Sequence, residues 1–214
     1  MIGSVRDPHA GQAVLAQGPQ PADARFTVIL LHGRGAPAED IVGLAQELQL
    51  RDVAYLAPQA AGNTWYPYSF LSPIERNEPG ITSGLRVIER LVDELGRQGV
   101  DADRVGFLGF SQGACLALEF AARHARRYAG VVALSGGLIG PPGTPRDYPG
   151  SFDGTPVFLG CSDIDPHIPL ERVHESADVF RRMGATVDER IYPQMGHTVN
   201  RDEIDVVRAL LSKP

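Results

Sequence analysis

Short apolar runs alternate with amphipathic helical runs along nearly the whole of this 214-residue chain. The run at 26–31 is continuously apolar and stops at a His-Gly pair, as a buried parallel strand does. Apolar residues spaced three or four apart follow it and indicate a helix that faces a core. The remaining strand-like runs lie at 53–57, 105–109, 131–134, 157–160 and 187–192. This alternation predicts an α/β fold, with a mostly parallel central sheet covered by helices on both faces.

Nothing in the sequence divides the chain, because it contains no repeat, no low-complexity tract and no linker. We therefore expect a single domain over residues 1–214, which is an ordinary domain size. The stretch at 136–155 is rich in glycine and proline, and we interpret it as a surface excursion rather than a large cap domain. In a sheet of this kind, ligands bind beyond the carboxyl ends of the strands, so chemistry is expected there.

The composition argues against nucleic acids and metals as partners. Lysine and arginine total 20 against 26 acidic residues, for a net charge of -6, whereas phosphate binding needs a basic face. The chain carries no cluster of histidine, cysteine and aspartate at metal-ligand spacing. The segment at 33–35 lacks the lysine and the length of a phosphate-binding loop. We expect no nucleic acid, no metal and no cofactor.

The cysteines and the apolar runs bear on location. Only two cysteines occur, Cys115 and Cys161, which excludes a disulfide scaffold and favours a reducing compartment. The first residues contain no apolar signal-peptide core, and no apolar run approaches the roughly 18 residues of a membrane span. We therefore expect a cytoplasmic protein that has no membrane partner.

The sequence Gly109-Phe110-Ser111-Gln112-Gly113 places one serine between a buried strand and a buried helix. A serine on such a turn is held in a strained conformation at the end of the sheet, and the flanking glycines leave the space that the turn needs. The hydroxyl also lies at a helix N-terminus, where developing negative charge is stabilised. This context predicts a nucleophile at Ser111, against the alternative of an ordinary glycine-rich turn.

A serine nucleophile needs a base and an acid, and both residue types follow later strands. His197 follows the last strand-like run and precedes the final helix. Asp163 and Asp165 follow the run before it, and either carboxylate could orient the histidine. The order serine, aspartate, histidine is that of α/β-hydrolases. Pro166 stiffens the backbone after Asp165, which favours Asp165 over Asp163 as the acid.

Two backbone N–H groups must stabilise the oxyanion of a tetrahedral intermediate. We expect one from Gln112, directly after the nucleophile. The other is expected from the loop after the first long strand, His32-Gly33-Arg34-Gly35, at the N–H of Arg34. Because the backbone carries this function, the Arg34 side chain is interpreted as a solvated rim, and His32 as a structural partner of the loop.

The segment at 65–71 contains the only tryptophan, two tyrosines and a phenylalanine. This density, between a strand and the next helix, predicts an apolar wall beside the site. Trp65 and Tyr66 are the residues that we expect to contact substrate. The alternative is a packed loop that only covers the sheet.

Four segments together resemble the phospholipase/carboxylesterase family of α/β-hydrolases, which includes the acyl-protein thioesterases. They are Leu31-His32-Gly33-Arg34-Gly35, Gly109-Phe110-Ser111-Gln112-Gly113, Asp165-Pro166-His167-Ile168-Pro169 and Gly196-His197. The resemblance implies a catalytic triad and two oxyanion donors, namely Ser111, Asp165 and His197 with Arg34 and Gln112. It also favours a place for Trp65 near the acyl or alcohol pocket. The chain departs from the family in its longer acid loop, and in Arg34 where the thioesterases commonly carry leucine.

These residues predict a serine carboxylesterase that hydrolyses short- to medium-chain esters of small molecules through an acyl-enzyme. The arginine at position 34 and the lack of an inserted cap predict an open cleft rather than a lipid tunnel. A thioesterase or lysophospholipase on the same triad is the nearest alternative. A non-catalytic binding protein of this fold is the alternative from another class. The oligomeric state is left open, with a homodimer as one alternative.

Overall fold

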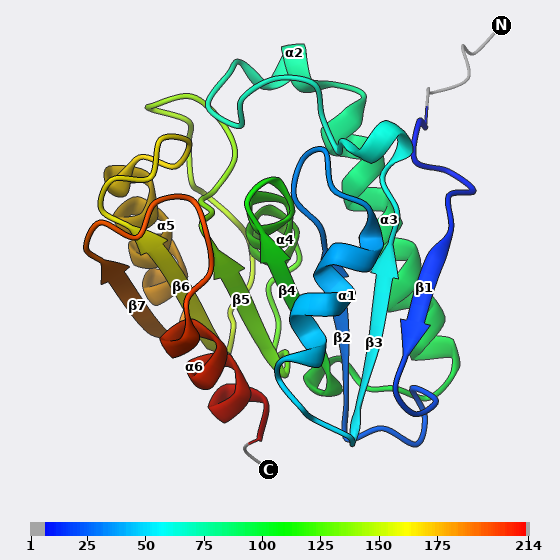
Figure 1. The fold of residues 1–214 in the computed structure, drawn as a ribbon. Coiled ribbons are helices and arrows are strands. Elements are labelled where there is room, and N and C mark those ends of the chain that lie inside the picture. Colours follow the sequence, from blue (N-terminus) through cyan, green and yellow to red (C-terminus); the bar gives the residue numbers. More distant parts are fainter. Residues whose placement is uncertain (1–6, 213–214) are drawn as a thin grey trace, which may run out of the picture.

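The computed structural model describes residues 7–212, in which seven strands form one sheet (Figure 1). The strands are β1 (Val14–Gln17), β2 (Phe26–Leu31), β3 (Val53–Pro58), β4 (Val105–Phe110), β5 (Gly130–Leu134), β6 (Pro156–Ser162) and β7 (Thr186–Tyr192). They lie in the order β1-β3-β2-β4-β5-β6-β7. The pairing of β1 with β3 is antiparallel and the other pairings are parallel. The predicted mostly parallel sheet is confirmed.

Helices cover both faces of this sheet, as predicted. They are α1 (Ala38–Gln46), α2 (Ile74–Asn77), α3 (Gly80–Arg97), α4 (Gln112–Arg123), α5 (Leu170–Arg182) and α6 (Arg201–Ser212), with 3₁₀ turns at Ala61–Asn63 and Ala102–Arg104. α1 and α6 lie on one face, and α3, α4 and α5 on the other (Figure 1). None of these helices is long and apolar enough to cross a membrane.

Strand β2 shows how the sequence divides the core between the two faces. Val28 and Leu30 pack with α1 and α6, whereas Ile29 and Leu31 pack with α3 and α4. Successive side chains of a strand point to opposite faces, so a strand that is covered on both sides must be apolar throughout. The continuous apolar run at 26–31 therefore reflects a central position in the sheet.

Two parts of the chain differ from what the sequence predicted. The edge strand β1 was not predicted, because its residues alternate between exposed and half-buried and Val14 is 42% exposed. The stretch at 136–155 is less superficial than expected, since Leu138, Ile139 and Phe152 are buried in the core. Within residues 7–212 this stretch packs onto the domain and forms no cap.

The carboxyl ends of the parallel strands meet at one edge of the sheet, and each predicted site residue follows one of them. The loop that contains Arg34 follows β2, and Ser111 follows β4. Asp165 lies in the loop after β6, and His197 in the loop after β7. The loops that follow four strands distant in sequence therefore lie together at this edge of the sheet.

Candidate active site

Ser111 lies in a strained turn between β4 and α4. Its φ of 55° and ψ of -119° fall where residues other than glycine are rare, and its N–H donates to the Leu134 carbonyl at 2.9 Å. A Cβ at Gly113 would lie 2.0 Å from the Leu31 carbonyl oxygen, and one at Gly109 would lie 2.4 Å from the Gly113 carbonyl. Only glycine fits at these two positions, because β2, β4 and the first turn of α4 pack so closely.

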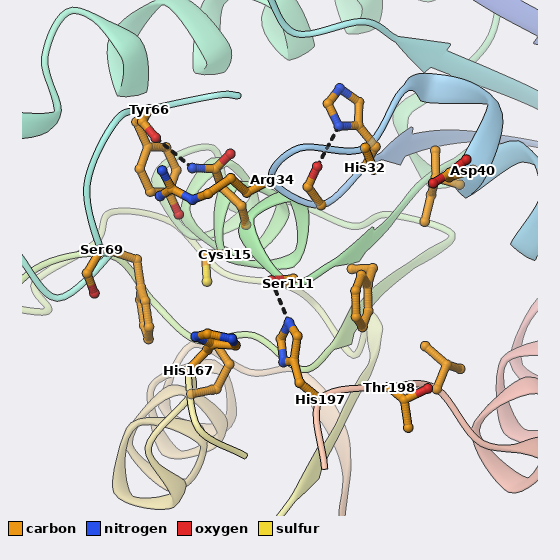
Figure 2. A pocket seen from close by; sticks show the side chains of 18 of the residues that line it. His32, Arg34, Asp40, Tyr66, Ser69, Ser111, Cys115, His167, His197 and Thr198 are labelled. Carbon is orange, nitrogen blue, oxygen red and sulfur yellow. Dashed lines mark hydrogen bonds between the residues drawn. The ribbon is translucent and has the colours of Figure 1, made fainter. Parts of the chain in front are cut away.

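The structure brings Ser111, His197 and Asp165 together. Ser111 Oγ lies 2.8 Å from His197 Nε2 (Figure 2), and His197 Nδ1 lies 2.7 Å from Asp165 Oδ2. An ionised carboxylate can only accept, so Nδ1 carries the ring proton and donates it to Asp165. Nε2 is then the acceptor for the serine hydroxyl, which is the geometry that a general base needs.

Asp165 is held in an environment that keeps it ionised. Its side chain is 0% exposed, and its second oxygen, Oδ1, accepts the N–H groups of His167 at 2.8 Å and Ile168 at 3.1 Å. Burial alone would raise the pKa of Asp165. The hydrogen bonds from His197 and from the two backbone N–H groups outweigh burial, and the pKa is lowered below its usual value.

Asp163, the alternative acid, has a different neighbour. It is exposed, and its Oδ1 accepts the N–H of Gln194 at 2.7 Å. Ser162 Oγ accepts the N–H of Gly196 at 3.0 Å. Both contacts join the loop after β6 to the loop that carries His197. The Asp163 carboxylate thus fastens two loops to one another and is not directed at the imidazole.

A further pair of residues fixes the end of the His197 loop, and the sequence reasoning missed it. Asn200 Oδ1 accepts the N–H of Glu203 at 2.9 Å, and Glu203 Oε2 accepts the N–H of Asn200 at 2.8 Å. This reciprocal capping box starts α6, and an Asn-x-x-Glu pattern before an apolar run would have revealed it. Glu203 is 0% exposed, and burial raises its pKa to about 7.

Arg34 and Gln112 keep their backbone N–H groups without a partner in the part of the chain that the structure describes. The loop of Arg34 is shaped by His32, which is 0% exposed. His32 Nδ1–H donates to the Gly33 carbonyl at 2.8 Å, and Nε2 accepts the N–H of Ala60 at 3.0 Å. His32 therefore lies where the sequence placed it, as a structural partner of this loop.

The side chain of Gln112 holds residues 65–70, which we name the wall segment. Gln112 Oε1 accepts the N–H of Trp65 at 2.8 Å, and Nε2 donates to the Tyr66 carbonyl at 2.7 Å. The side chain is 5% exposed, so both contacts are shielded from water. One buried amide thus pairs two main-chain groups that would otherwise lack partners.

The side chains of Arg34 and Asn77 hold the next part of the wall segment. Arg34 Nη1 donates to the Pro67 carbonyl at 2.6 Å, and Nη2 donates to the Tyr68 carbonyl at 2.5 Å. Asn77 accepts the N–H of Tyr68 at 2.8 Å and donates to the Ser69 carbonyl at 2.9 Å. Arg34 is exposed, as a rim residue would be, but its guanidinium is fixed by main-chain carbonyls.

Trp65 does not line the cavity beside Ser111, so the prediction that it contacts substrate is wrong. Its side chain is 0% exposed, and the indole Nε1–H donates to the His32 carbonyl at 3.0 Å. The ring contacts the rings of His9 and His32, with centroid distances of 5.3 and 5.1 Å. Trp65 packs beneath the site, whereas the neighbouring Tyr66 does line the cavity.

A cavity of about 800 Å³ lies beside Ser111, which is within the usual range for small-molecule sites. Figure 2 shows the side chains of Arg34, Tyr66, Ser69, Cys115 and His167 to the left of Ser111. Asp40 and Thr198 lie to its right. Within residues 7–212, no group of three or more His, Cys, Asp or Glu side chains could hold a metal ion.

A serine, an aspartate and a histidine in this chain order, on a mostly parallel sheet, define the chain as an α/β-hydrolase. The sequence profile of the Phospholipase/Carboxylesterase family matches residues 11–213. The chain therefore belongs to the phospholipase/carboxylesterase family, as its motifs predicted, and it is a serine ester hydrolase.

Similar proteins cover nearly the whole chain. Acyl-protein thioesterase 1 of Saccharomyces cerevisiae is 29% identical over 215 residues, which span 89% of this chain and 93% of that protein. Carboxylesterase SOBER1 of Arabidopsis thaliana is 22% identical over 209 residues, with 89% and 91% covered. The crystal structure of a phospholipase/carboxylesterase from Dyadobacter fermentans superposes with a TM-score of 0.91 at 42% identity, covering 95% of this chain and 97% of that one.

Proposed function

We propose that this chain is a serine carboxylesterase that hydrolyses short- to medium-chain esters of small molecules through an acyl-enzyme. The observation that carries the proposal is the 2.8 Å contact between Ser111 Oγ and His197 Nε2, next to a cavity of about 800 Å³. Asp165 supports it, because its buried carboxylate holds the imidazole in the tautomer that can accept the serine proton.

In the proposed mechanism, Ser111 Oγ attacks the ester carbonyl carbon while His197 Nε2 takes the hydroxyl proton. The carbonyl oxygen becomes an oxyanion that accepts the N–H groups of Arg34 and Gln112. The imidazolium, stabilised by Asp165, then returns the proton to the departing alcohol oxygen as the ester C–O bond breaks. A water molecule repeats the same steps on the acyl-enzyme and releases the carboxylic acid.

The size and the charge of the cavity support the proposal that the substrates have short or medium acyl groups. Its volume of about 800 Å³ must hold both the acyl and the alcohol part of an ester. The charged Arg34 side chain lies in its wall, and an extended apolar chain placed against a guanidinium would remove the charge from water without compensation. We therefore propose an open cleft for small esters and not a tunnel for long lipids.

A second activity on the same residues is supported by a named relative. The yeast protein that matches 89% of this chain is an acyl-protein thioesterase, and the steps above apply equally when sulfur is the leaving atom. A thioesterase or lysophospholipase is therefore the nearest alternative. A non-catalytic binding protein would have no use for a strained serine held against a histidine and a buried carboxylate.

Labelling with a fluorophosphonate probe tests the nucleophile. The parent protein should be labelled, and Ser111→Ala should be neither labelled nor active on 4-nitrophenyl butanoate, because the acyl-enzyme can no longer form. Ser151→Ala removes an exposed serine hydroxyl from the loop before β6 and should keep both properties. Labelling that persists in Ser111→Ala would place the nucleophile elsewhere.

A series of 4-nitrophenyl esters, with thioesters of the same acyl chains, tests the substrate class. We expect kcat/KM to be highest for short or medium chains and to be higher for esters than for matched thioesters. A clear preference for acyl chains of about 16 carbons would contradict the open cleft, because such chains need an extended apolar tunnel. A preference for thioesters would select the alternative activity.

The organisation of the protein is part of the same proposal. We propose that the chain acts as a single domain in the cytoplasm, which is consistent with its two free and buried cysteines. A small-molecule ester is the only partner that the mechanism requires. Light scattering of the purified protein would decide between a monomer and a homodimer.

A further inference from the structure

The cavity beside Ser111 is chemically different on its two sides. The side to the left of Ser111 in Figure 2 contains the guanidinium of Arg34 and the imidazole of His167. The side to the right contains the carboxylate of Asp40. Ile41 and Leu44, on the same helix as Asp40, also line the cavity. A substrate therefore meets a cationic side and a side that is apolar with one negative charge.

The positive charge of Arg34 has no acidic partner within residues 7–212. Its two described hydrogen bonds go to the neutral carbonyls of Pro67 and Tyr68, and its Cζ lies 5.8 Å from the ring centroid of Tyr66. A guanidinium has five N–H donors, so three remain for a ligand.

The two carbonyl contacts also fix the position of this charge. A free arginine loses much rotational freedom when it binds a ligand, whereas a guanidinium that is already held gives up little. The backbone N–H of the same residue is one of the two proposed oxyanion donors. A ligand group on the guanidinium is therefore a few bonds away from the reacting carbonyl.

His167 adds a second polar group on the same side. Its backbone N–H is held by Asp165 Oδ1 at 2.8 Å, and its ring contacts the ring of His197 edge-on with a centroid distance of 4.9 Å. No hydrogen bond of the His167 ring is formed with another residue in the described part of the chain. The ring is exposed and lines the cavity, where it can donate to an anionic oxygen.

We propose that the preferred substrates are esters that carry a carboxylate a few bonds from the scissile carbonyl, with the carboxylate bound by Arg34 and His167. This inference rests on the proposed function, because it concerns the substrate of that same site. Asp40 enforces the orientation, since a carboxylate on its side of the cavity would be repelled. A planar guanidinium matches the two oxygens of a carboxylate better than an ammonium does.

The test compares esters that differ only in this charge. Monoethyl succinate is matched by ethyl isocaproate, in which an isopropyl group replaces the carboxylate on the acyl side. The butanoate ester of β-hydroxypropionate is matched by isoamyl butanoate, which makes the same replacement on the alcohol side. The readout is the ratio of kcat/KM for the anionic ester to that for its neutral partner, so any common loss of activity in a variant cancels.

We expect a ratio well above one in the parent protein for at least one pair. Arg34→Met should lower that ratio about tenfold, as befits the loss of a hydrogen-bonded charge, and Arg34→Lys should retain part of it. Arg76→Met is the matched control, because Arg76 lies over the Tyr68 ring at 4.4 Å but does not line the cavity. This variant should leave the ratio unchanged, and added salt should lower the ratio in the parent.

A ratio near or below one for both pairs, or a ratio that Arg34→Met leaves unchanged, would overturn the inference while the esterase activity stands. If none of the four esters is hydrolysed, the proposed function fails, and the inference is then tested by binding. Calorimetric titration of Ser111→Ala with monoethyl succinate should give a dissociation constant that rises about tenfold when Arg34→Met is added. No detectable binding of monoethyl succinate would overturn the inference there as well.

Discussion

Replacing Glu203 with glutamine should make the protein more stable at alkaline pH and leave its stability in mild acid nearly unchanged. The Glu203 carboxyl is 0% exposed. One of its oxygens, Oε2, accepts the Asn200 N–H, whereas Oε1 has no partner within residues 7–212. A Cβ at Gly160 would lie 2.2 Å from Oε1, so the oxygen rests directly against the backbone of β6. No cation compensates this carboxyl in the described part of the chain.

The magnitude follows from the pKa of this carboxyl. Burial, with a smaller contribution from the nearby carboxylate of Asp202, raises the pKa of Glu203 from 4.5 to about 7 in the folded protein. Between these values the unfolded chain loses the proton while the folded protein retains it, so stability falls as the pH rises. At ~1.4 kcal/mol for each pH unit, the parent protein loses about 3 kcal/mol from this residue by pH 8. A glutamine cannot ionise and loses nothing.

Urea denaturation of both proteins between pH 4 and pH 9 measures the effect. The difference in unfolding free energy, variant minus parent, should rise from near zero at the acid end to about 3 kcal/mol above pH 7. Glutamine keeps an oxygen for the Asn200 N–H, so the capping box is preserved. Glu171→Gln, at an exposed glutamate in the first turn of α5, is the matched control and should show no such rise.

A difference that is flat across this range, or that falls with pH, would refute the reasoning. It would mean that Glu203 ionises in the folded state as easily as in the unfolded chain. The surroundings of Oε1 would then have to admit water or a cation, contrary to the packing described above.

Two further outcomes follow from the geometry of the site. Asp165→Asn should lower kcat about ten-thousandfold, because the imidazole of His197 is no longer held in the right tautomer, whereas Asp163→Asn should cost far less activity on the same ester. Gly113→Ala should give little folded protein, as judged by soluble yield and circular dichroism. Its Cβ would lie 2.0 Å from the Leu31 carbonyl oxygen, which is backbone that cannot move aside.

The central part of the fold could be predicted because burial on both faces leaves a strong mark on the sequence. The apolar run of β2 and the run that precedes Ser111 both correspond to central strands. β1 left no comparable mark, since an edge strand of four residues with exposed side chains resembles a loop. The capping box of Glu203 and Asn200 could have been predicted, because its spacing is visible in the sequence.

The sequence predicts which residues lie at the edge of the sheet where the strands end, but not how their side chains are oriented there. Placing Ser111 and His197 at the same edge of the sheet required no distances, because parallel strands end at one edge. Choosing between Asp163 and Asp165 depends on where each carboxylate points, and two residues of one loop can point to different neighbours. The prediction that Trp65 contacts substrate failed for a related reason. A high density of aromatic residues does not distinguish a side chain that faces a cavity from one that packs beneath it.

The main chain of the wall segment is held by the side chains of three residues that lie outside the segment. The Gln112 side chain forms hydrogen bonds with the backbone at Trp65 and Tyr66. The side chains of Arg34 and Asn77 form hydrogen bonds with the backbone at positions 67 and 68. The exposed side chains of Tyr68 and Ser69 are therefore not needed to keep the path of the segment. The exposed positions 68 and 69 can be randomised in a library without loss of the scaffold. An enzyme built in this way can acquire a new substrate range by single substitutions there, while its catalytic framework is inherited unchanged.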